Sequence, residues 1–322
     1  MQRQRSLILD RYYKECGKLS VKLSQSHNRI TVDELITKKI NEYSHIFPNA
    51  YHDVPSRHRD MPYRIFLRLI QQRLQATYDD DVYPYEGVNQ FETDICLIEK
   101  SLVANKGAHA GLFAVRRLLR RIRTFGFHLV KLDIRQNALV HRKVVGECLG
   151  EVDWLDWSTE ERCNRIELAL NTKESPISTQ EVQTRKTFAI FQAIAFCRRK
   201  YGKHAIGPFI ISMTQGADDI LTVLLLAYWG GLHNRQEEVP LDITPLLETV
   251  DDLKKGPEIL ESLLTNNTYR EHLKFRNDRQ IVMIGYSDSN KDSGLASARW
   301  ALQNAQVTLA TTVSKKNIEL IL

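Results

Sequence analysis

The residues most able to do chemistry lie in the stretch 287–294, which reads SDSNKDSG. It contains the carboxylates Asp288 and Asp292, the cation Lys291 and several serine hydroxyls. An apolar run over 280–286 precedes it and predicts a buried strand. A helical pattern follows it, with one apolar face that consists of Leu295, Ala298, Leu302, Ala305 and Leu309. We expect a polar loop here, with Asp292 or Ser293 capping the helix. Such a loop can hold a divalent cation beside a phosphate or carboxylate group.

The same stretch also has a purely structural explanation. Serine, aspartate, asparagine and glycine are ordinary turn and cap residues. On spacing alone, the turn and the site are equally acceptable interpretations. The choice between them depends on what lies at the ends of the other predicted strands.

Polar residues also end three further predicted strands, which cover residues 128–136, 209–214 and 241–247. Arg135 lies at the end of the first strand, and Glu248 follows the third. Because parallel strands place their carboxyl ends at one edge, these side chains should converge with Asp288. Each has an alternative: Glu248 could be a helix-start acid, Arg135 could pair with a helix, and Asp288 could be a turn residue.

These groups favour a small anionic substrate that chelates a metal. Mg²⁺ is usually held by one or two carboxylates together with water and substrate phosphate. An arginine makes a fork-shaped contact with phosphate or carboxylate, and Lys291 adds a compact positive charge. A metal and cations stabilise the charge that develops in enolate or phosphoryl chemistry, so we expect that reaction class.

The elements that position these groups alternate between strand and helix. That order predicts parallel pairing through right-handed crossovers. A fifth strand is predicted over 318–322. We expect a predominantly helical α/β fold: an incomplete (β/α) barrel of about five parallel strands with a large helical surround. A doubly wound sheet is the alternative, although no glycine fingerprint or P-loop follows any predicted strand.

Two regions are predicted along the chain. Residues 1–124 form a helical region, and residues 125–322 form the partial α/β barrel that carries the metal and substrate site. The sequence stops at Leu322 inside an apolar run, and five strands leave an open sheet edge. We therefore expect a piece of a longer protein, truncated at its C-terminus.

The composition argues against membrane and secreted classes. Hydrophobic residues make up 43% of the chain and charged residues 26%, as in ordinary globular proteins. No apolar stretch is long enough to span a bilayer, and no signal-peptide pattern follows Met1. The five cysteines are scattered, which favours free thiols in a reducing compartment. We expect a cytoplasmic protein with no membrane partner.

A basic helix face is the main alternative source of function. The chain carries a net charge of +6, and an arginine stripe lies within 116–123. Such a stripe could make a non-enzymatic polyanion-binding protein. More often it is solvated or paired with acids of the same fold, and no aromatic residues alternate with it to stack on bases. We expect no nucleic-acid partner.

Four motifs follow one another along the chain: LVKLDIRQ (129–136), FIISMT (209–214), PLLETVDDL (245–253) and GYSDSNKDSGLASARWALQNAQ (285–306). In this order and at these separations they resemble the central region of the phosphoenolpyruvate carboxylase family. The resemblance covers roughly residues 60–322, and before the first motif it is supported by helical character and the sequence PYR at Tyr63. The last motif is the most specific of the four.

The resemblance implies a mostly helical protein built around an eight-stranded α/β barrel. It implies a carbon–carbon lyase that adds bicarbonate to phosphoenolpyruvate, giving oxaloacetate and phosphate, with Mg²⁺ or Mn²⁺ as cofactor. The chemistry passes through carboxyphosphate and the enolate of pyruvate, and it feeds the tricarboxylic acid cycle by carbon dioxide fixation. The full-length protein is expected to be a homotetramer. By motif match, the two metal ligands are Glu248 and Asp288.

The other site residues are also carried over by motif match. Arg135 corresponds to the arginine that holds the substrate phosphate, which makes it both catalytic and substrate-binding. Lys291 lies in the same active-site loop and is expected to be catalytic. Leu246 and Met283 fall where the family lines an apolar pocket near the substrate's methylene group.

The sequence departs from the family pattern in three places. It contains neither the Thr-Ala-His-Pro-Thr-Glu stretch with the catalytic histidine nor the His-Gly-Arg-Gly-Gly loop that should follow 318–322. Asn137 and Ala138 stand where the family often has Glu-Ser. We therefore expect this chain alone to be inactive. Another metal-dependent barrel enzyme acting on phosphoenolpyruvate or a keto acid is the alternative among enzymes.

Overall fold

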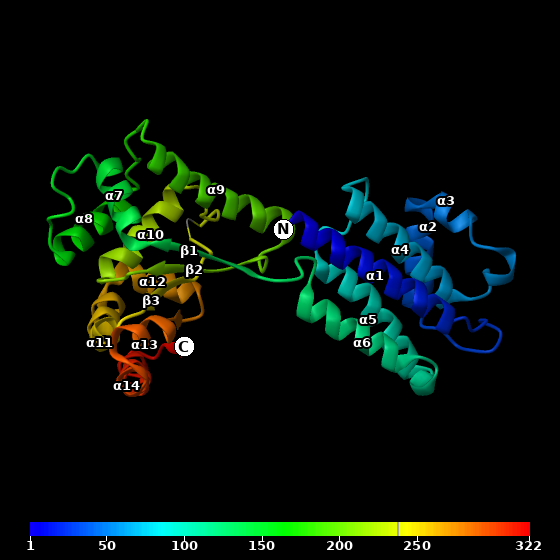
Figure 1. Ribbon diagram of the computed structural model, residues 1–322. Helices are drawn as coiled ribbons and strands as arrows, with labels where there is room; N and C mark the ends of the chain where they lie inside the picture. Colours follow the sequence, from blue (N-terminus) through cyan, green and yellow to red (C-terminus); the bar gives the residue numbers. More distant parts are fainter. Residues whose placement is uncertain (237) are drawn as a thin grey trace. The chain divides into compact units, whose positions relative to one another are not determined.

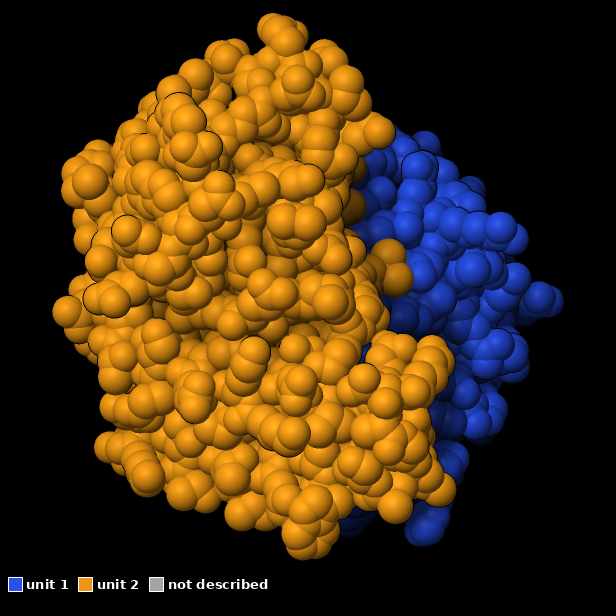
Figure 2. Space-filling view, turned by 60° about the vertical axis from the view of Figure 1, so that its left-hand side comes forward, with its two compact units in different colours: residues 1–131, 199–205 blue, residues 132–198, 206–322 orange. Residues whose placement is uncertain are grey.

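The computed structural model describes residues 1–236 and 238–322 and shows a helix-rich α/β chain (Figure 1). The chain divides into two compact units, which Figure 2 distinguishes by colour. Unit 1 comprises Met1–Lys131 and Arg199–Ala205, and unit 2 comprises Leu132–Arg198 and Ile206–Leu322. The helix-rich α/β class is confirmed, whereas the division into domains at 124/125 stays a prediction.

Unit 1 is built from helices that share one apolar core. The α-helices are α1 (Gln2–Lys22), α2 (Glu34–Ile46), α3 (Pro48–His52), α4 (Pro62–Asp79), α5 (Val88–Ala104) and α6 (Leu112–Phe125), and the 3-10 helices are η1 (Ser56–His58) and η2 (Gly107–His109). Helix α6 places Val115, Leu118 and Ile122 at helical spacing, and all three are buried. Helix α4 begins on Pro62, whose fixed φ suits a first helical position.

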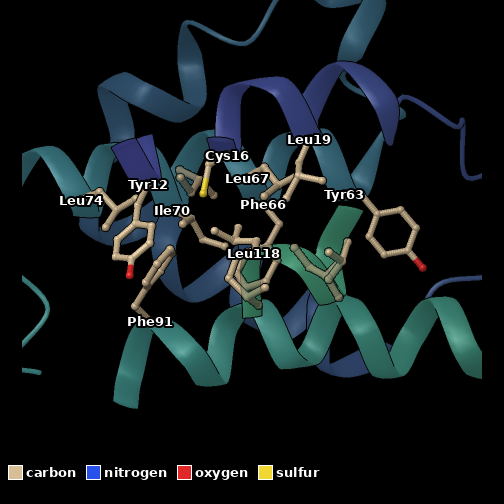
Figure 3. Packing of buried hydrophobic residues seen from close by; sticks show 14 of the residues in the cluster. Tyr12, Cys16, Leu19, Tyr63, Phe66, Leu67, Ile70, Leu74, Phe91 and Leu118 are labelled. Atoms are coloured by element: carbon tan, nitrogen blue, oxygen red, sulfur yellow. The ribbon is translucent and has the colours of Figure 1, made fainter. Parts of the chain in front are cut away.

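The core of unit 1 combines aromatic packing with one buried carboxylate. Figure 3 shows Tyr12 and Phe91 packed among aliphatic side chains, and their ring centroids lie 5.3 Å apart. The carboxylate of Asp94 accepts hydrogen bonds of 2.7 Å from the hydroxyls of both Tyr43 and Tyr85. These bonds offset the cost of burying a carboxylate, so that α2 and α5 can meet around a polar group.

Among its described residues, unit 2 contains six short strands, and each hydrogen-bonded pairing between them is parallel. They are β1 (Leu132–Asn137), β2 (Ile206–Ser212), β3 (Ile243–Leu247), β4 (Arg279–Ile281), β5 (Met283–Ile284) and β6 (Glu319–Ile321). Four strands form a sheet in the order β1-β2-β3-β5, and β4 pairs with β6. The predicted parallel arrangement is confirmed, and closure into a barrel stays a prediction.

The strand predicted over 280–286 is divided into β4 and β5 at Val282. The backbone N–H of Val282 donates to the carbonyl oxygen of Ile321 at 2.9 Å, which continues the pairing of β4 with β6. Immediately afterwards the segment pairs with β3 instead. The prediction of one continuous strand was therefore wrong in this detail, because the segment changes its pairing partner within a single extended run.

Helices pack around the sheet of unit 2. They are α7 (Ala138–Leu149), α8 (Thr159–Thr172), α9 (Val182–Tyr201), α10 (Ala217–Trp229), α11 (Val250–Thr265), α12 (Asn267–Phe275), α13 (Ser287–Ser293) and α14 (Leu295–Ser314). The ring of Phe209 on β2 stacks on Phe191 of α9 at 5.2 Å and lies 5.4 Å from the ring of His141 on α7. One sheet face is thus covered by helices. No helix in the described part of the chain is both long and apolar enough to cross a membrane.

Two buried histidines of unit 2 predict a loss of stability in mild acid. Burial lowers the pKa of His141 to about 4, and burial followed by the charge of Arg276 lowers the pKa of His272 to about 4. An unfolded histidine titrates near pH 6.5. Because the folded pKa is the lower one, stability is complete above about pH 6.5 and falls as the pH drops towards 4, by up to about 3 kcal/mol per histidine.

Chemical denaturation at a series of pH values between 7 and 4 measures this effect. Substituting His141→Gln removes one titrating group, so the free energy of unfolding should depend less steeply on pH. The exposed His109 is a matched control, and His109→Gln should leave the slope unchanged. Equal slopes for His141→Gln and the parent chain would contradict the assignment.

Candidate metal and anion site

Four of the predicted site residues lie on one face of the sheet or at its edge. Side chains alternate between the two faces along a strand, and Arg135 is among the exposed residues of β1. The register aligns Arg135 with Ile210 of β2, and Ile210 with Thr244 of β3. Leu246 and Glu248 follow Thr244 at two-residue intervals. All of these side chains therefore lie on one face, opposite to the helix-covered face that carries Phe209.

Arg135 and Glu248 are in direct contact across this face. The Nη2 group of Arg135 donates to Oε1 of Glu248, although 113 residues separate them in the sequence. The arginine side chain is 54% exposed, whereas that of Glu248 is only 8% exposed. Within the described residues, Glu248 is the only polar partner of the guanidinium group. A guanidinium group that a buried carboxylate holds in place can present its remaining N–H groups to an anion.

Leu246 and Met283 form an apolar patch beside this pair. They are directly aligned in the register between β3 and β5, so their side chains lie next to each other on the same face. Leu246 is 2% exposed and Met283 is 37% exposed. The structure thus brings the two predicted pocket residues together, and their contact with substrate stays a prediction.

Asp288 and Lys291 lie on a short helix instead of in the predicted loop. Helix α13 places them one turn apart, and Lys291 Nζ lies 3.0 Å from Asp288 Oδ1. Both side chains are more than half exposed. In the described part of the chain, each carboxylate of the predicted metal site therefore has a cation as its neighbour.

The prediction of a polar loop over 287–294 was wrong for a local reason. The hydroxyls of Ser289 and Ser293 donate to backbone carbonyls four residues earlier, at 2.7 and 3.0 Å. These bonds let serines sit within a helical turn instead of competing with it. Helix α14 then begins after Gly294 without a side-chain cap, so capping by Asp292 or Ser293 was also wrong.

The segment before α13 packs tightly onto the end of β3. The N–H of Gly285 donates to the carbonyl oxygen of Leu247 at 2.7 Å. A Cβ at position 285 would lie 2.9 Å from the Cα of Glu248, so this approach requires a glycine. Asp292 also accepts a 3.4 Å hydrogen bond from the N–H of Val250. The start of α13, which carries Asp288, is therefore a neighbour of the strand end that carries Glu248.

The donor atoms at this edge suit a hard divalent cation. Glu248 and Asp288 offer carboxylate oxygens, which Mg²⁺ and Mn²⁺ accept as ligands. Among residues 1–236 and 238–322, no group of three or more histidine, cysteine, aspartate and glutamate side chains forms a metal site. A cation held by these two carboxylates would need oxygens from water and substrate to complete its coordination.

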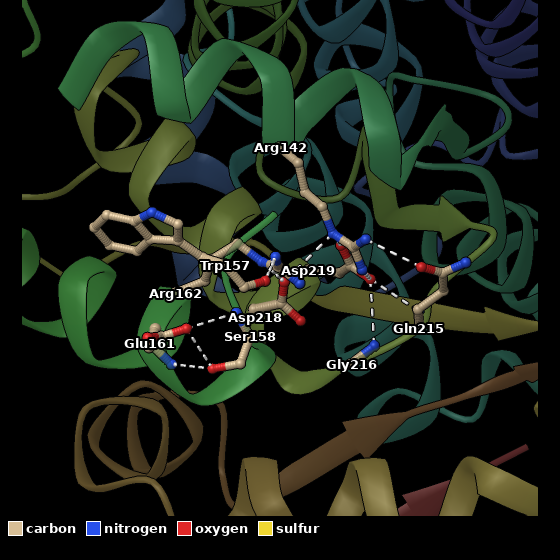
Figure 4. Close-up of polar contacts among 9 residues, drawn as sticks. All are labelled: Arg142, Trp157, Ser158, Glu161, Arg162, Gln215, Gly216, Asp218 and Asp219. Atoms are coloured by element: carbon tan, nitrogen blue, oxygen red, sulfur yellow. Dashed lines mark hydrogen bonds and ion pairs between the residues drawn. The ribbon is translucent and has the colours of Figure 1, made fainter. Parts of the chain in front are cut away.

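A buried ion-pair network lies next to the turn that follows β2, and the sequence patterns did not predict it. Figure 4 shows Arg142 of α7 reaching Asp219 at the start of α10. Arg142 donates to both carboxylate oxygens of Asp219, at 2.7 and 2.8 Å. Asp219 also accepts the backbone N–H groups of Gln215 and Gly216 at 2.8 and 3.4 Å. These hydrogen bonds hold the turn that follows Met213 in place. The backbone of Met213 itself is left-handed, with a φ of 59°.

The second half of the network is equally buried. Arg162 of α8 donates to Asp218 at 2.7 Å and to the backbone carbonyl of Trp157. Asp218 and Asp219 are both fully buried. Burial, together with the neighbouring charge of Asp218, raises the pKa of Asp219. The acids at a helix start were visible in the sequence, but their partners lie 56 and 77 residues away and no local pattern identifies them.

The arginine stripe of α6 is partly neutralised within unit 1. Arg116 pairs with Glu99 at 2.7 Å, and Arg121 pairs with Glu15 at 2.9 Å. The acids come from α5 and α1, against which α6 packs. This pairing favours the structural interpretation of the stripe over polyanion binding.

The chain is similar to proteins of a known family. A family model described as phosphoenolpyruvate carboxylase matches residues 1–322. The phosphoenolpyruvate carboxylase of Xanthomonas euvesicatoria pv. vesicatoria (strain 85-10) is 44% identical over 317 residues, which cover 98% of this chain and 35% of that protein. The enzyme of the same name from Prochlorococcus marinus (strain MIT 9215) is 32% identical over 356 aligned positions, with the same coverage. The chain spans about a third of the length of the curated relatives it matches.

Proposed function

This chain belongs to the phosphoenolpyruvate carboxylase family, and from that membership we propose that it forms part of an enzyme that carboxylates phosphoenolpyruvate. Bicarbonate is added to phosphoenolpyruvate, and the products are oxaloacetate and phosphate. In this proposal the chain contributes the divalent-cation site and part of the substrate site. The observation that carries the proposal is the contact between Arg135 and Glu248 on the face that also holds Leu246 and Met283.

Each residue has a distinct role in the proposed site. Glu248 and Asp288 would hold Mg²⁺ or Mn²⁺, which supplies positive charge to stabilise an enolate oxygen. Arg135 would bind the substrate phosphate with its free N–H groups. Lys291, one helical turn from Asp288, would add a second cation for the anionic substrate.

The apolar pair has a complementary role. Leu246 and Met283 would contact the methylene group of phosphoenolpyruvate, because they form the uncharged part of a face whose other groups are ionised. An apolar contact beside the charged groups orients the substrate, since only its methylene end can lie there without losing hydrogen bonds.

The ion pair between Arg135 and Glu248 couples the two halves of the proposed site. A cation that binds Glu248 competes with the guanidinium group for the same carboxylate. Arg135 then has more N–H groups available for phosphate. Cation and phosphate should therefore strengthen each other's binding, which is the reciprocity that linked equilibria require.

The wider setting belongs to the same proposal. The parallel strands of unit 2 would be part of an eight-stranded barrel in the complete protein. That protein would be a cytoplasmic homotetramer, and it would supply oxaloacetate to the tricarboxylic acid cycle. The support for this setting is the family membership alone.

Calorimetric titration of the chain with phosphoenolpyruvate tests the proposal. Binding should require Mn²⁺ or Mg²⁺, and Arg135→Gln should weaken it at least about tenfold, as expected for losing charged hydrogen bonds. With bicarbonate added, a malate dehydrogenase-coupled assay should show only background turnover for this chain. Cation-independent binding, or no effect of Arg135→Gln, would refute the proposed site, and a product that forms without bicarbonate would indicate a different metal-dependent enzyme.

A further inference from the structure

Unit 1 contains a cavity of about 330 Å³ beside the first turns of α4. Its walls come from α1, from the segment that includes η1, and from α4 itself. The residues that matter for its chemistry are Ser20, Asp53, His58, Arg64, Arg68 and Gln71. All of them belong to the same compact unit. None of the residues that line the cavity belongs to unit 2.

Two arginines line this cavity one helical turn apart. Arg64 and Arg68 are neighbours on the surface of α4, and like charges at this spacing destabilise a helix. Neither of them forms an ion pair with a carboxylate within the described residues. Arg64 Nη1 donates to the hydroxyl of Ser24 at 2.6 Å, which fixes the direction of its guanidinium group. Within the described residues, the side chain of Arg68 forms neither a hydrogen bond nor an ion pair.

The charge around the cavity is predominantly positive. The pKa of His58 is lowered by desolvation and then by the positive charges of Arg64 and Arg57, although Asp60 acts in the opposite direction. Asp53 is the one carboxylate in the lining, and it forms an ion pair with neither arginine. Two uncompensated guanidinium groups and one carboxylate leave the cavity with an excess of positive charge.

We propose that this cavity binds the phosphate group of a small phosphorylated metabolite. Two guanidinium forks on one helix face can each donate two N–H groups, and a phosphate dianion has enough oxygen atoms to accept from both. A monocarboxylate, with two oxygen atoms and a single negative charge, would satisfy them less well. The neutral lining groups, Ser20 and Gln71, offer polar contacts to the remainder of such a ligand. A volume of about 330 Å³ suits a small molecule.

Nuclear magnetic resonance of the arginine Nε–Hε groups in the full 322-residue chain tests the proposal directly. Inorganic phosphate is the probe, titrated at constant ionic strength, with chloride and malonate as the comparison anions. The signals of Arg64 and Arg68 should shift together and saturate with phosphate. Chloride should cause no saturable shift, and malonate should bind more weakly. Arg120, an exposed arginine on α6, is the internal control and should not respond.

Substitutions give a second, independent measurement. Arg68→Gln should weaken phosphate binding about tenfold, since a hydrogen bond to a charged group is lost, and Arg68→Lys should recover only part of the affinity. Because Arg68 is exposed, neither change should unfold the chain, and Arg120→Gln should leave the affinity unchanged. Shifts of Arg64 and Arg68 that match those of Arg120, stronger binding of malonate, or unchanged affinity in Arg68→Gln would each overturn the proposal.

Discussion

Replacing Glu248 by glutamine is expected to weaken Mn²⁺ binding by about a hundredfold or more. Mutation of a residue that only supports a metal ligand already lowers metal affinity about 10- to 100-fold, and Glu248 would be a ligand itself. Glutamine keeps the size of the side chain and its hydrogen bond from Arg135, but it removes the negative charge. Paramagnetic resonance of free Mn²⁺ during a titration measures the affinity. In an enzyme that contains the whole site, the same change should also abolish carboxylation.

The control for Glu248→Gln is a glutamate on α11, the helix that follows strand β3. Glu258 is exposed on α11, and Glu258→Gln removes the same charge from unit 2 without touching the edge of the sheet. It should leave Mn²⁺ affinity within experimental error of the parent chain. An unchanged Mn²⁺ affinity in Glu248→Gln, or equal losses of affinity in both variants, would show that Glu248 is not a ligand of the cation.

Replacing Asp219 by alanine is expected to cost about 3–5 kcal/mol of stability, the usual effect of breaking a buried ion pair, because Arg142 would keep only its longer contact of 3.3 Å with Asp218. Arg142 would lose its two hydrogen bonds of 2.7 and 2.8 Å to this carboxylate. The N–H groups of Gln215 and Gly216 would lose their acceptor as well. For a unit of this size, the thermal midpoint should fall by roughly ten degrees.

Two further variants separate burial from charge as the cause. Glu261 and Lys316 form a partly exposed pair of 2.8 Å in unit 2, and Glu261→Gln should cost less than about 1 kcal/mol. The double change of Asp219 and Arg142 to leucine should regain much of the loss, because no unpaired charge remains buried. A cost below about 1 kcal/mol for Asp219→Ala would show that Arg142 finds another partner.

The sequence predicted those parts of the fold that local patterns control. Strands β1, β2 and β3 lie within or close to their predicted ranges, because β2 and β3 are largely apolar runs and β1 alternates apolar with polar residues. Helix α14 buries Ala298, Leu302 and Leu309 along the predicted stripe, although Leu295 at its start is exposed. In these segments, the spacing of apolar residues along the sequence matches the spacing of the side chains that are buried in the fold.

The remaining features depend on partners that local patterns do not identify. The break at Val282 arises because β6 and β3 pair with different parts of one segment. The pairing of Arg142 with Asp219 joins two helices that are distant in sequence. For the candidate site, strand ends and family resemblance indicated the residue set. They did not indicate that Arg135 and Glu248 pair with each other, which only the register of three strands brings about.

The most direct measurement is anomalous diffraction at the manganese edge from crystals of this chain grown with Mn²⁺ and phosphoenolpyruvate. We expect one manganese peak bound by the carboxylates of Glu248 and Asp288, with the substrate phosphate on the guanidinium group of Arg135. Manganese bound elsewhere, with the ion pair between Arg135 and Glu248 intact, would contradict this expectation.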